Sequence, residues 1–147
     1  CNVVDSKMAI FGSEFTMIML LAGDATSLVQ LEMQLPPLAM ELDLLTMMKR
    51  TTRHQDQSTD KYLVLLQGPD QSGTIKQLTS YLADHEIDIS SLKSDTFLKD
   101  EQEWQSAEIV VELPKPDDFE HFSLDFEKQC QALNMECTIN PITIQAL

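Results

Sequence analysis

Apolar and polar positions in the C-terminal part of the chain alternate between strand-like and helix-like spacing. Short runs rich in β-forming residues predict four strands, at 61–67, 87–97, 104–113 and 137–144. A helix over 74–83 has Ile75, Leu78 and Leu82 on one side, and a polar, acidic loop from Leu98 to Glu103 separates the two middle strands. A second helix begins at Asp118, can be capped by Asp117 or Asp118, and buries Phe119, Phe122, Phe126, Cys130 and Leu133.

The order of these elements is strand, helix, strand, strand, helix, strand. Right-handed crossovers then place both helices on one face of a four-stranded antiparallel sheet, with the first strand in its middle. We therefore predict an α+β, ferredoxin-like domain.

The N-terminal part repeats the second half of this pattern. Asn2 to Lys7 aligns with Asp88 to Lys93, and strands at 3–10 and 14–21 form a hairpin around Phe11-Gly12-Ser13. A helical pattern follows over 25–41, in which Pro36-Pro37 should cause a kink or a restart, and Leu42 to Met48 resembles a closing strand.

The first copy thus lacks the opening strand and helix that the second copy possesses, because only Cys1 precedes Asn2. Without that strand, we expect a gap in the first sheet, with unpaired backbone groups and an uncovered apolar face. Residues 53–60 contain no aliphatic anchor. The predicted organisation is a partial domain at 1–53, a linker at 54–60 and a complete domain at 61–147, two ferredoxin-like domains in tandem.

Charge and composition restrict the possible partners. Ten basic and 24 acidic residues give a net charge of −14, which repels nucleic acid and anionic membrane surfaces. The basic cluster from Lys49 to Arg53 is best interpreted as the solvated start of the linker. No apolar run reaches the ~20 residues of a membrane span, and no signal peptide is visible, so we expect a cytoplasmic protein.

Chemistry-bearing residues are sparse. Cys1, Cys130 and Cys137 form no CxxC pair, which argues against a disulfide framework and a zinc site; the last two are interpreted as buried small hydrophobic residues. His54, His85 and His121 lie in a linker or near helix ends without a partner nucleophile. The chain is therefore not expected to be an enzyme or to need a cofactor.

The turn Gly68 to Ile75 that opens a helix, together with Ile87-Asp88-Ile89 at the next strand, resembles ACT domains, small regulatory modules that bind amino acids. The segments from Cys1 to Thr16 and from Leu42 to Arg50 are similar to tandem ACT proteins of the glycine cleavage system transcriptional repressor family. This resemblance spans essentially the whole chain.

The resemblance also implies ligand-binding residues. The family's Asp-x-Pro-Gly loop maps onto Asp70, Gln71, Ser72 and Gly73, with Ser72 departing from the pattern, and Thr74 begins the helix whose amides suit a carboxylate. A family asparagine at the start of the second strand maps onto Asn2, followed by Val3, and Asp88 takes this position in the second copy. If the copies pack as tandem ACT domains do, one composite site joins the Gly73 loop to the strand at Asn2. A plain turn and helix start explains the same loop without a ligand.

The expected function is an amino-acid-sensing regulator, with glycine as the candidate ligand, that represses transcription through contact with an activator protein. The incomplete first copy also leads us to expect a homo-oligomer. An alternative is the ACT regulatory portion of an amino-acid or folate enzyme. A third possibility is an ACT-fold adaptor that binds no ligand. Ser72 and Asp88, which depart from the family's binding residues, would then be signs of a lost site.

Overall fold

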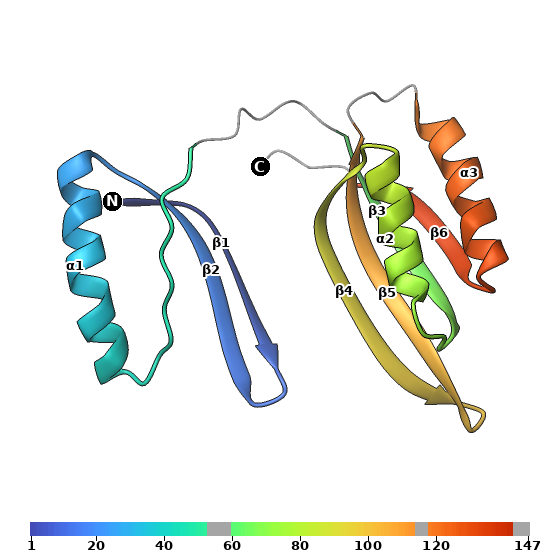
Figure 1. Ribbon diagram of the computed structural model, residues 1–147, viewed down its shortest axis with the longest axis horizontal. Helices are drawn as coiled ribbons and strands as arrows, with labels where there is room; N and C mark the ends of the chain where they lie inside the picture. Colours follow the sequence, from blue (N-terminus) through green and yellow to red (C-terminus); the bar gives the residue numbers. More distant parts are fainter. Residues whose placement is uncertain (53–59, 114–117, 143–147) are drawn as a thin grey trace. The chain divides into compact units, whose positions relative to one another are not determined.

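The computed structural model describes residues 1–52, 60–113 and 118–142, and the chain divides into two compact units, Cys1–Arg53 (unit 1) and His54–Leu147 (unit 2) (Figure 1). No helix in these described ranges is long and apolar enough to cross a membrane. The predicted linker at 54–60 lies, except for Asp60, outside the described residues.

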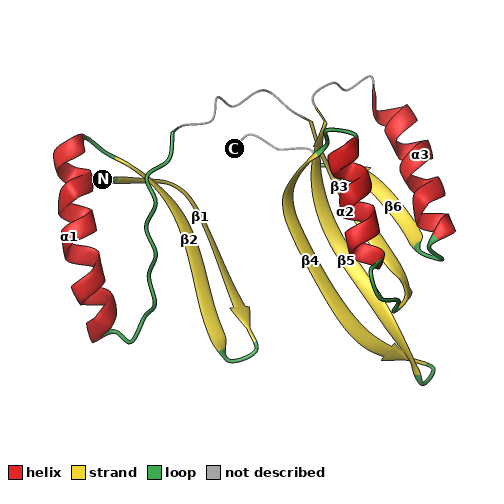
Figure 2. Ribbon diagram, viewed as in Figure 1, coloured by secondary structure: helices red, strands yellow, loops and turns green. Residues whose placement is uncertain are grey.

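Unit 2 has the predicted order of elements. It consists of β3 (Asp60–Pro69), α2 (Thr74–Asp84), β4 (Asp88–Lys99), β5 (Gln102–Leu113), α3 (Phe119–Ala132) and β6 (Glu136–Pro141). The strands form one antiparallel sheet in the order β4-β5-β3-β6, so the first strand lies in the interior as predicted. Both helices lie on the same side of this sheet (Figure 2).

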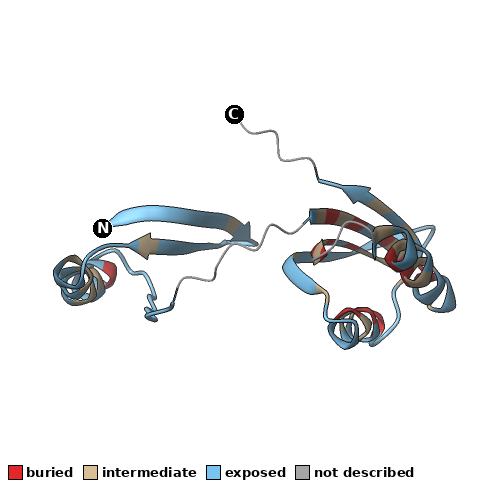
Figure 3. Ribbon diagram, turned by 90° about the horizontal axis from the view of Figure 1, so that it is seen from above, coloured by how far each residue is buried: buried red, intermediate tan, exposed pale blue. Residues whose placement is uncertain are grey.

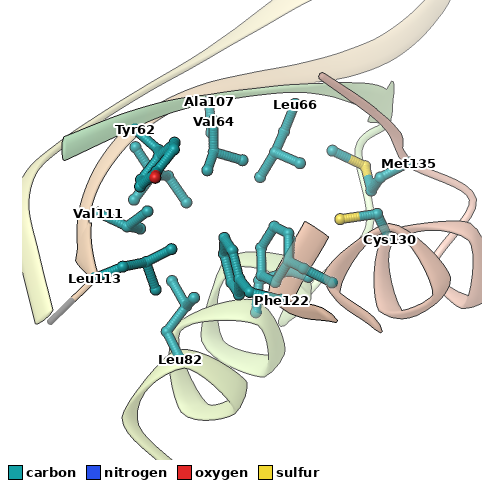
Figure 4. Packing of buried hydrophobic residues seen from close by; sticks show 13 residues of the cluster. Tyr62, Val64, Leu66, Leu82, Ala107, Val111, Leu113, Phe122, Cys130 and Met135 are labelled. Carbon is teal, nitrogen blue, oxygen red and sulfur yellow. The ribbon is translucent and has the colours of Figure 1, made fainter. Parts of the chain in front are cut away.

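The core of unit 2 fills the space between sheet and helices. Alternate residues of β3 and β5 point toward the helices, and the side chains there are almost completely buried (Figure 3). Phe126 of α3 and Leu78 and Leu82 of α2 complete this core from the other side. The buried cluster in Figure 4 comprises Tyr62, Val64, Leu66, Leu78, Leu82, Ala107, Ile109, Val111, Leu113, Phe122, Phe126, Cys130 and Met135.

Unit 1 contains a hairpin and one helix among its described residues. The hairpin pairs β1 (Asn2–Phe11) with β2 (Glu14–Ala22), and Gly12 adopts the positive φ of +61° that its tight turn requires. The helix α1 (Ala25–Glu41) begins where the Asp24 carboxylate accepts a hydrogen bond of 2.7 Å from the Ser27 amide.

The helix α1 continues through Pro36-Pro37, so the restart that we considered is wrong. Pro36 and Pro37 have no backbone N–H, so the carbonyls of Glu32 and Met33 do not accept the hydrogen bonds that they would accept in a regular helix. Met33 is exposed, which allows solvent to satisfy its carbonyl. The helix is thus tolerated because its interrupted bonds lie near the surface.

The predicted closing strand at Leu42 to Met48 is wrong. Leu42 and Asp43 form a turn, and residues 44–52 have no regular secondary structure. In unit 2 the closing strand β6 pairs with the opening strand β3. Unit 1 offers no such neighbouring strand among its described residues. Segment 44–52 is instead attached to α1, because the Arg50 guanidinium donates two hydrogen bonds to the Glu32 carboxylate, at 2.7 and 3.0 Å.

One irregularity occurs in both hairpins at the position where the two copies align. The register of β1 against β2 shifts between Val3 and Asp5, and the register of β4 against β5 shifts between Ile89 and Ser91. A β-bulge of this kind is a specific local feature that bends a strand. Its recurrence at aligned positions, Val4 and Ser90, supports the internal repeat seen in the sequence.

Two smaller expectations also need correction. Asp118 stands at the start of α3, but its side chain makes no capping hydrogen bond, while Asp117 lies outside the described residues. The loop between β4 and β5 is shorter than predicted, because Asp100 and Glu101 both adopt positive φ and form a two-residue turn.

Candidate ligand-binding loop

The loop from Asp70 to Gly73 connects the end of β3 to the first residue of α2. It is fixed at both ends: the Asp70 amide donates to the Glu103 carbonyl at 2.9 Å, and Thr74 closes the loop through Gln71. Both the amide and the hydroxyl of Thr74 donate to the Gln71 carbonyl, at 3.3 and 3.0 Å. Thr74 is buried, whereas Asp70 to Gly73 are exposed, so the predicted loop is a firmly held turn with an open outer surface.

Gly73 determines how this turn enters the helix. Its φ of +86° lies in the left-handed region, which a residue with a side chain adopts only at a cost. A Cβ atom at Gly73 would meet nothing within 4 Å. The glycine is therefore required by the backbone conformation and leaves open space beside the loop.

The start of α2 presents amides without a side-chain cap. Gly73 stands at the N-cap and supplies no side chain, and the first turn contains no acidic residue. Within the described part of the chain, no acceptor is recorded for the amides of Ile75 and Lys76. Free amides at a helix start carry partial positive charge and suit a carboxylate.

Lys76 is a candidate that sequence reasoning missed. It lies exposed in the first turn of α2, where a basic side chain opposes the helix dipole and an acidic one would be favoured. This misplaced charge was visible in the sequence. Together with the free amides, Lys76 makes this helix start attractive to an anion, while the exposed oxygens of Asp70 and Gln71 can accept from an ammonium group.

The structure places Asp88 at the opposite end of unit 2 from the loop. Asp88 lies across from Glu112, which in turn lies across from Lys61, whereas the loop follows Pro69. Eight residues of β3 separate these two levels, which corresponds to about 26 Å along the strand. Asp88 and the Gly73 loop therefore cannot bind one small ligand within unit 2. Asn2 and Val3 begin β1 of unit 1.

A shallow hollow of about 340 Å³ lies on the sheet face that the helices leave uncovered. Its lining combines apolar Leu65 with Gln67, Lys93, Asp95 and Glu108, and the Lys93 ammonium lies 3.6 Å from the Asp95 carboxylate. Lys93 is the only basic residue of this lining, against Asp95, Glu108 and Glu136, so the hollow is negatively charged and would repel a carboxylate. The loop remains the better candidate for an amino acid.

Comparison with known proteins identifies the family. A family model described as the ACT domain matches residues 1–49. The glycine cleavage system transcriptional repressor of Escherichia coli (strain K12) is 31% identical, over 97% of this chain and 76% of the relative. The chain belongs to this repressor family. The alignment includes both units, so the family assignment does not rest on either one alone.

Solved structures agree with membership of the repressor family. A crystal structure assigned to a glycine cleavage system transcriptional repressor has a TM-score of 0.80 and 30% identity, covering 97% of this chain and 81% of that one. A protein of unknown function from Galdieria sulphuraria shares the fold, with a TM-score of 0.74, 22% identity and coverage of 97% and 82%. The predicted α+β, ACT-like fold is therefore confirmed.

Proposed function

We propose that this chain is an amino-acid-sensing regulator that represses transcription of the glycine cleavage system through contact with an activator protein. The observation that carries the proposal is the 31% identity to a repressor of that system over 97% of the chain. A net charge of −14 supports an indirect route, because a strongly acidic protein is repelled by the DNA backbone. Regulation without catalysis and a place in the cytoplasm belong to the same proposal.

The architecture in this proposal is two ACT units in tandem, of which unit 1 lacks an opening strand and helix within residues 1–53. The repeated bulge at Val4 and Ser90 supports this, as does the match of the ACT family model to residues 1–49. Unit 2 supplies the complete order of strands and helices for comparison. The uncovered hairpin of unit 1 supports self-association.

The ligand in this proposal is a small amino acid such as glycine, bound at the loop from Asp70 to Thr74. Amides at the α2 start would receive its carboxylate, with Lys76 adding positive charge. Asn2, Val3 and Asp88 are also proposed ligand residues, on the basis of the family resemblance. Asn2 carries both a donor and an acceptor, so Asn2→Ala should weaken amino-acid binding if this assignment holds.

Calorimetric titration with glycine, alanine and serine tests the ligand assignment. We expect saturable heat with a small amino acid, and weaker binding by Gly73→Ala, because alanine at φ +86° costs about 1–2 kcal/mol and pushes the loop out of shape. A loss of about 1.4 kcal/mol corresponds to a tenfold weaker affinity. Lys76→Gln should weaken binding in the same direction.

Gly12→Ala is the matched control for Gly73→Ala. Gly12 also has a positive φ, +61°, and an added Cβ there also meets nothing within 4 Å, but it lies in the hairpin turn of unit 1. Binding by the Gly12 variant should remain as in the parent chain. Absence of heat with every amino acid would remove the sensor proposal, and equal losses in both glycine variants would remove the loop from it.

A further inference from the structure

Two cysteine side chains in unit 2 face the same core, one from α3 and one from β6. Cys130 lies in the last turn of α3 and is completely buried. Cys137 is the second residue of β6 and lies across from Leu66, whose side chain faces the helices. Residues paired across a sheet point to the same face, so Cys137 also points toward α3, and it packs against the buried cluster.

The turn between the two cysteines holds them in place. The amides of Leu133 and Met135 both donate to the Cys130 carbonyl, at 3.0 and 2.9 Å, which folds residues 131–136 tightly back onto α3. The Cys130 side chain points from α3 into the buried cluster, close to Met135 (Figure 4). The two thiols, seven positions apart in sequence, thus both face the space between α3 and the sheet.

The two thiols differ in their chemistry. A hydrogen bond from Cys130 lowers the pKa of Cys137, although burial and the charge of Glu127 oppose this. The same bond, followed by burial, raises the pKa of Cys130. Cys137 is partly exposed and Cys130 is not, so the thiol that ionises first is also the one that solvent reaches.

We propose that Cys130 and Cys137 form a thiol–disulfide modification site that peroxides oxidise. Cys137 acts as the attacking thiol, since it is partly exposed on the edge strand β6. Cys130 acts as the resolving thiol, since it is completely buried in the cluster against which Cys137 packs and is shielded from solvent oxidants. Nucleophile and resolving partner are both supplied by the same short helix–turn–strand segment.

The reaction balances with hydrogen peroxide as the oxidant. The Cys137 thiolate attacks one peroxide oxygen, an S–O bond forms, the O–O bond breaks, and the leaving hydroxide takes a proton to become water. The Cys130 sulfur then loses its proton and attacks the Cys137 sulfur, so that the S–S bond forms, the S–O bond breaks and a second water leaves. Two electrons pass from the thiols to the peroxide.

The second step becomes easier once the first has occurred. The largest cause of the raised Cys130 pKa is its hydrogen bond to Cys137. Conversion of Cys137 to a neutral sulfenic acid removes the negative charge that this bond stabilises. The remaining barrier is the burial of Cys130, which the proximity of the target sulfur offsets.

A bridge at this place would constrain the turn that packs against the end of β3. A Cβ on Gly68 would lie 2.5 Å from the Met135 sulfur and 2.7 Å from the Asn134 carbonyl, which shows how closely this turn approaches the strand. Asn134 and Met135 both lie between the two cysteines. Formation of the bridge would therefore change the packing against Gly68 of β3, two residues before the Asp70 loop.

The test treats the folded 147-residue chain with hydrogen peroxide in a Cys1→Ser background. Cys1 is exposed, and its removal prevents bridges between chains. After alkylation of the remaining thiols, mass spectrometry should show loss of two hydrogen atoms and a peptide in which Cys130 and Cys137 are linked. In Cys130→Ser, the reaction should stop at a sulfenic acid on Cys137, which dimedone labels.

Several results would overturn the proposal. The proposal is wrong if both thiols remain alkylatable after peroxide has fully oxidised added glutathione. It is also wrong if dimedone labels position 130 in Cys137→Ser and does not label position 137 in Cys130→Ser. Oxidation of Cys137 to a sulfinic acid without a bridge would also contradict it. The peptide map of the Cys1→Ser chain needs no substitution in the core, so it decides the question even if Cys130→Ser and Cys130→Ala fail to fold.

Discussion

Gly68 and Gly73 lie five positions apart and are needed for different physical reasons. Gly73 is required by its backbone, because φ is +86° while the space around it is open. Gly68 has close neighbours instead: an added Cβ would lie 2.5 Å from the Met135 sulfur and 2.7 Å from a backbone carbonyl. Gly73 shapes the candidate ligand-binding loop, and Gly68 permits the α3–β6 turn to approach β3.

Gly68→Ala should destabilise unit 2 by about 1–3 kcal/mol, the usual cost of overpacking a tight site. Relief would require movement of the Asn134 backbone, which a flexible side chain alone cannot provide. Urea unfolding followed by tryptophan fluorescence measures the change, since Trp104 lies on β5 directly beside this end of β3. Gly23→Ala is the control, because it adds the same methyl group in unit 1, which does not contain the Trp104 probe.

An unchanged midpoint for Gly68→Ala would contradict the close packing of the turn. A comparable loss for Gly23→Ala would show that the assay responds to any added methyl group.

Residue-level chemistry was only partly predictable from the sequence. The buried faces of α2 and α3 follow from helical spacing, and Leu78, Phe126 and Cys130 are buried as predicted. The contact between Cys130 and Cys137 was not predicted, because their seven-residue spacing matches no familiar motif. It depends on a tight turn and on strand register, which place both side chains on one face.

At the scale of elements, the sequence pattern predicted the strands and helices of unit 2 but failed for the closing strand of unit 1. Leu42 to Met48 has the apolar content of a strand, and in unit 2 the equivalent segment is one. A strand exists only when a neighbour accepts its backbone hydrogen bonds. Among its described residues, unit 1 has only the β1–β2 hairpin and no strand equivalent to β3 with which Leu42 to Met48 could pair. The local sequence pattern could not predict this, because pairing depends on a strand distant in sequence.

The start of α1 provides a pH-dependent prediction. The hydrogen bond from the Ser27 amide holds the pKa of Asp24 below its ordinary value. A depressed pKa means that the carboxylate stabilises the folded helix fully above its unfolded pKa, and that this stabilisation is lost as pH falls through the folded pKa. The parent chain should therefore lose helical stability in acid relative to Asp24→Asn, whose amide retains the cap without titrating.

Thermal unfolding followed by circular dichroism at a series of acidic pH values measures this difference. The gap between the parent and Asp24→Asn should narrow as pH falls, because protonated aspartic acid and asparagine carry the same charge. Asp24→Ala removes cap and charge together and should be less stable than both at neutral pH. A gap that does not depend on pH would show that the Asp24 charge contributes nothing.

At the scale of the whole molecule, the two units differ most in whether the equivalent apolar face of the sheet is covered. In unit 2, α2 and α3 cover one face of the sheet. The register of the unit 1 hairpin identifies the residues on the equivalent face: Ile10 pairs with Phe15, and Met8 pairs with Met17. All four of these side chains are at least 45% exposed. Contiguous apolar surface of this kind usually marks a contact site.

We predict that the chain self-associates through this face of the hairpin, which consists of Met8, Ile10, Phe15, Met17 and Met19. Sedimentation velocity should show species larger than the 16.6 kDa monomer, in proportions that rise with concentration. Met17→Glu places a charge in the middle of the face and should shift the distribution toward monomer. Ile18→Glu is the matched control: Ile18 is 72% exposed but points to the opposite face, across from Lys7. A chain that remains monomeric at every concentration, or equal effects of the two glutamates, would show that the uncovered face does not drive association.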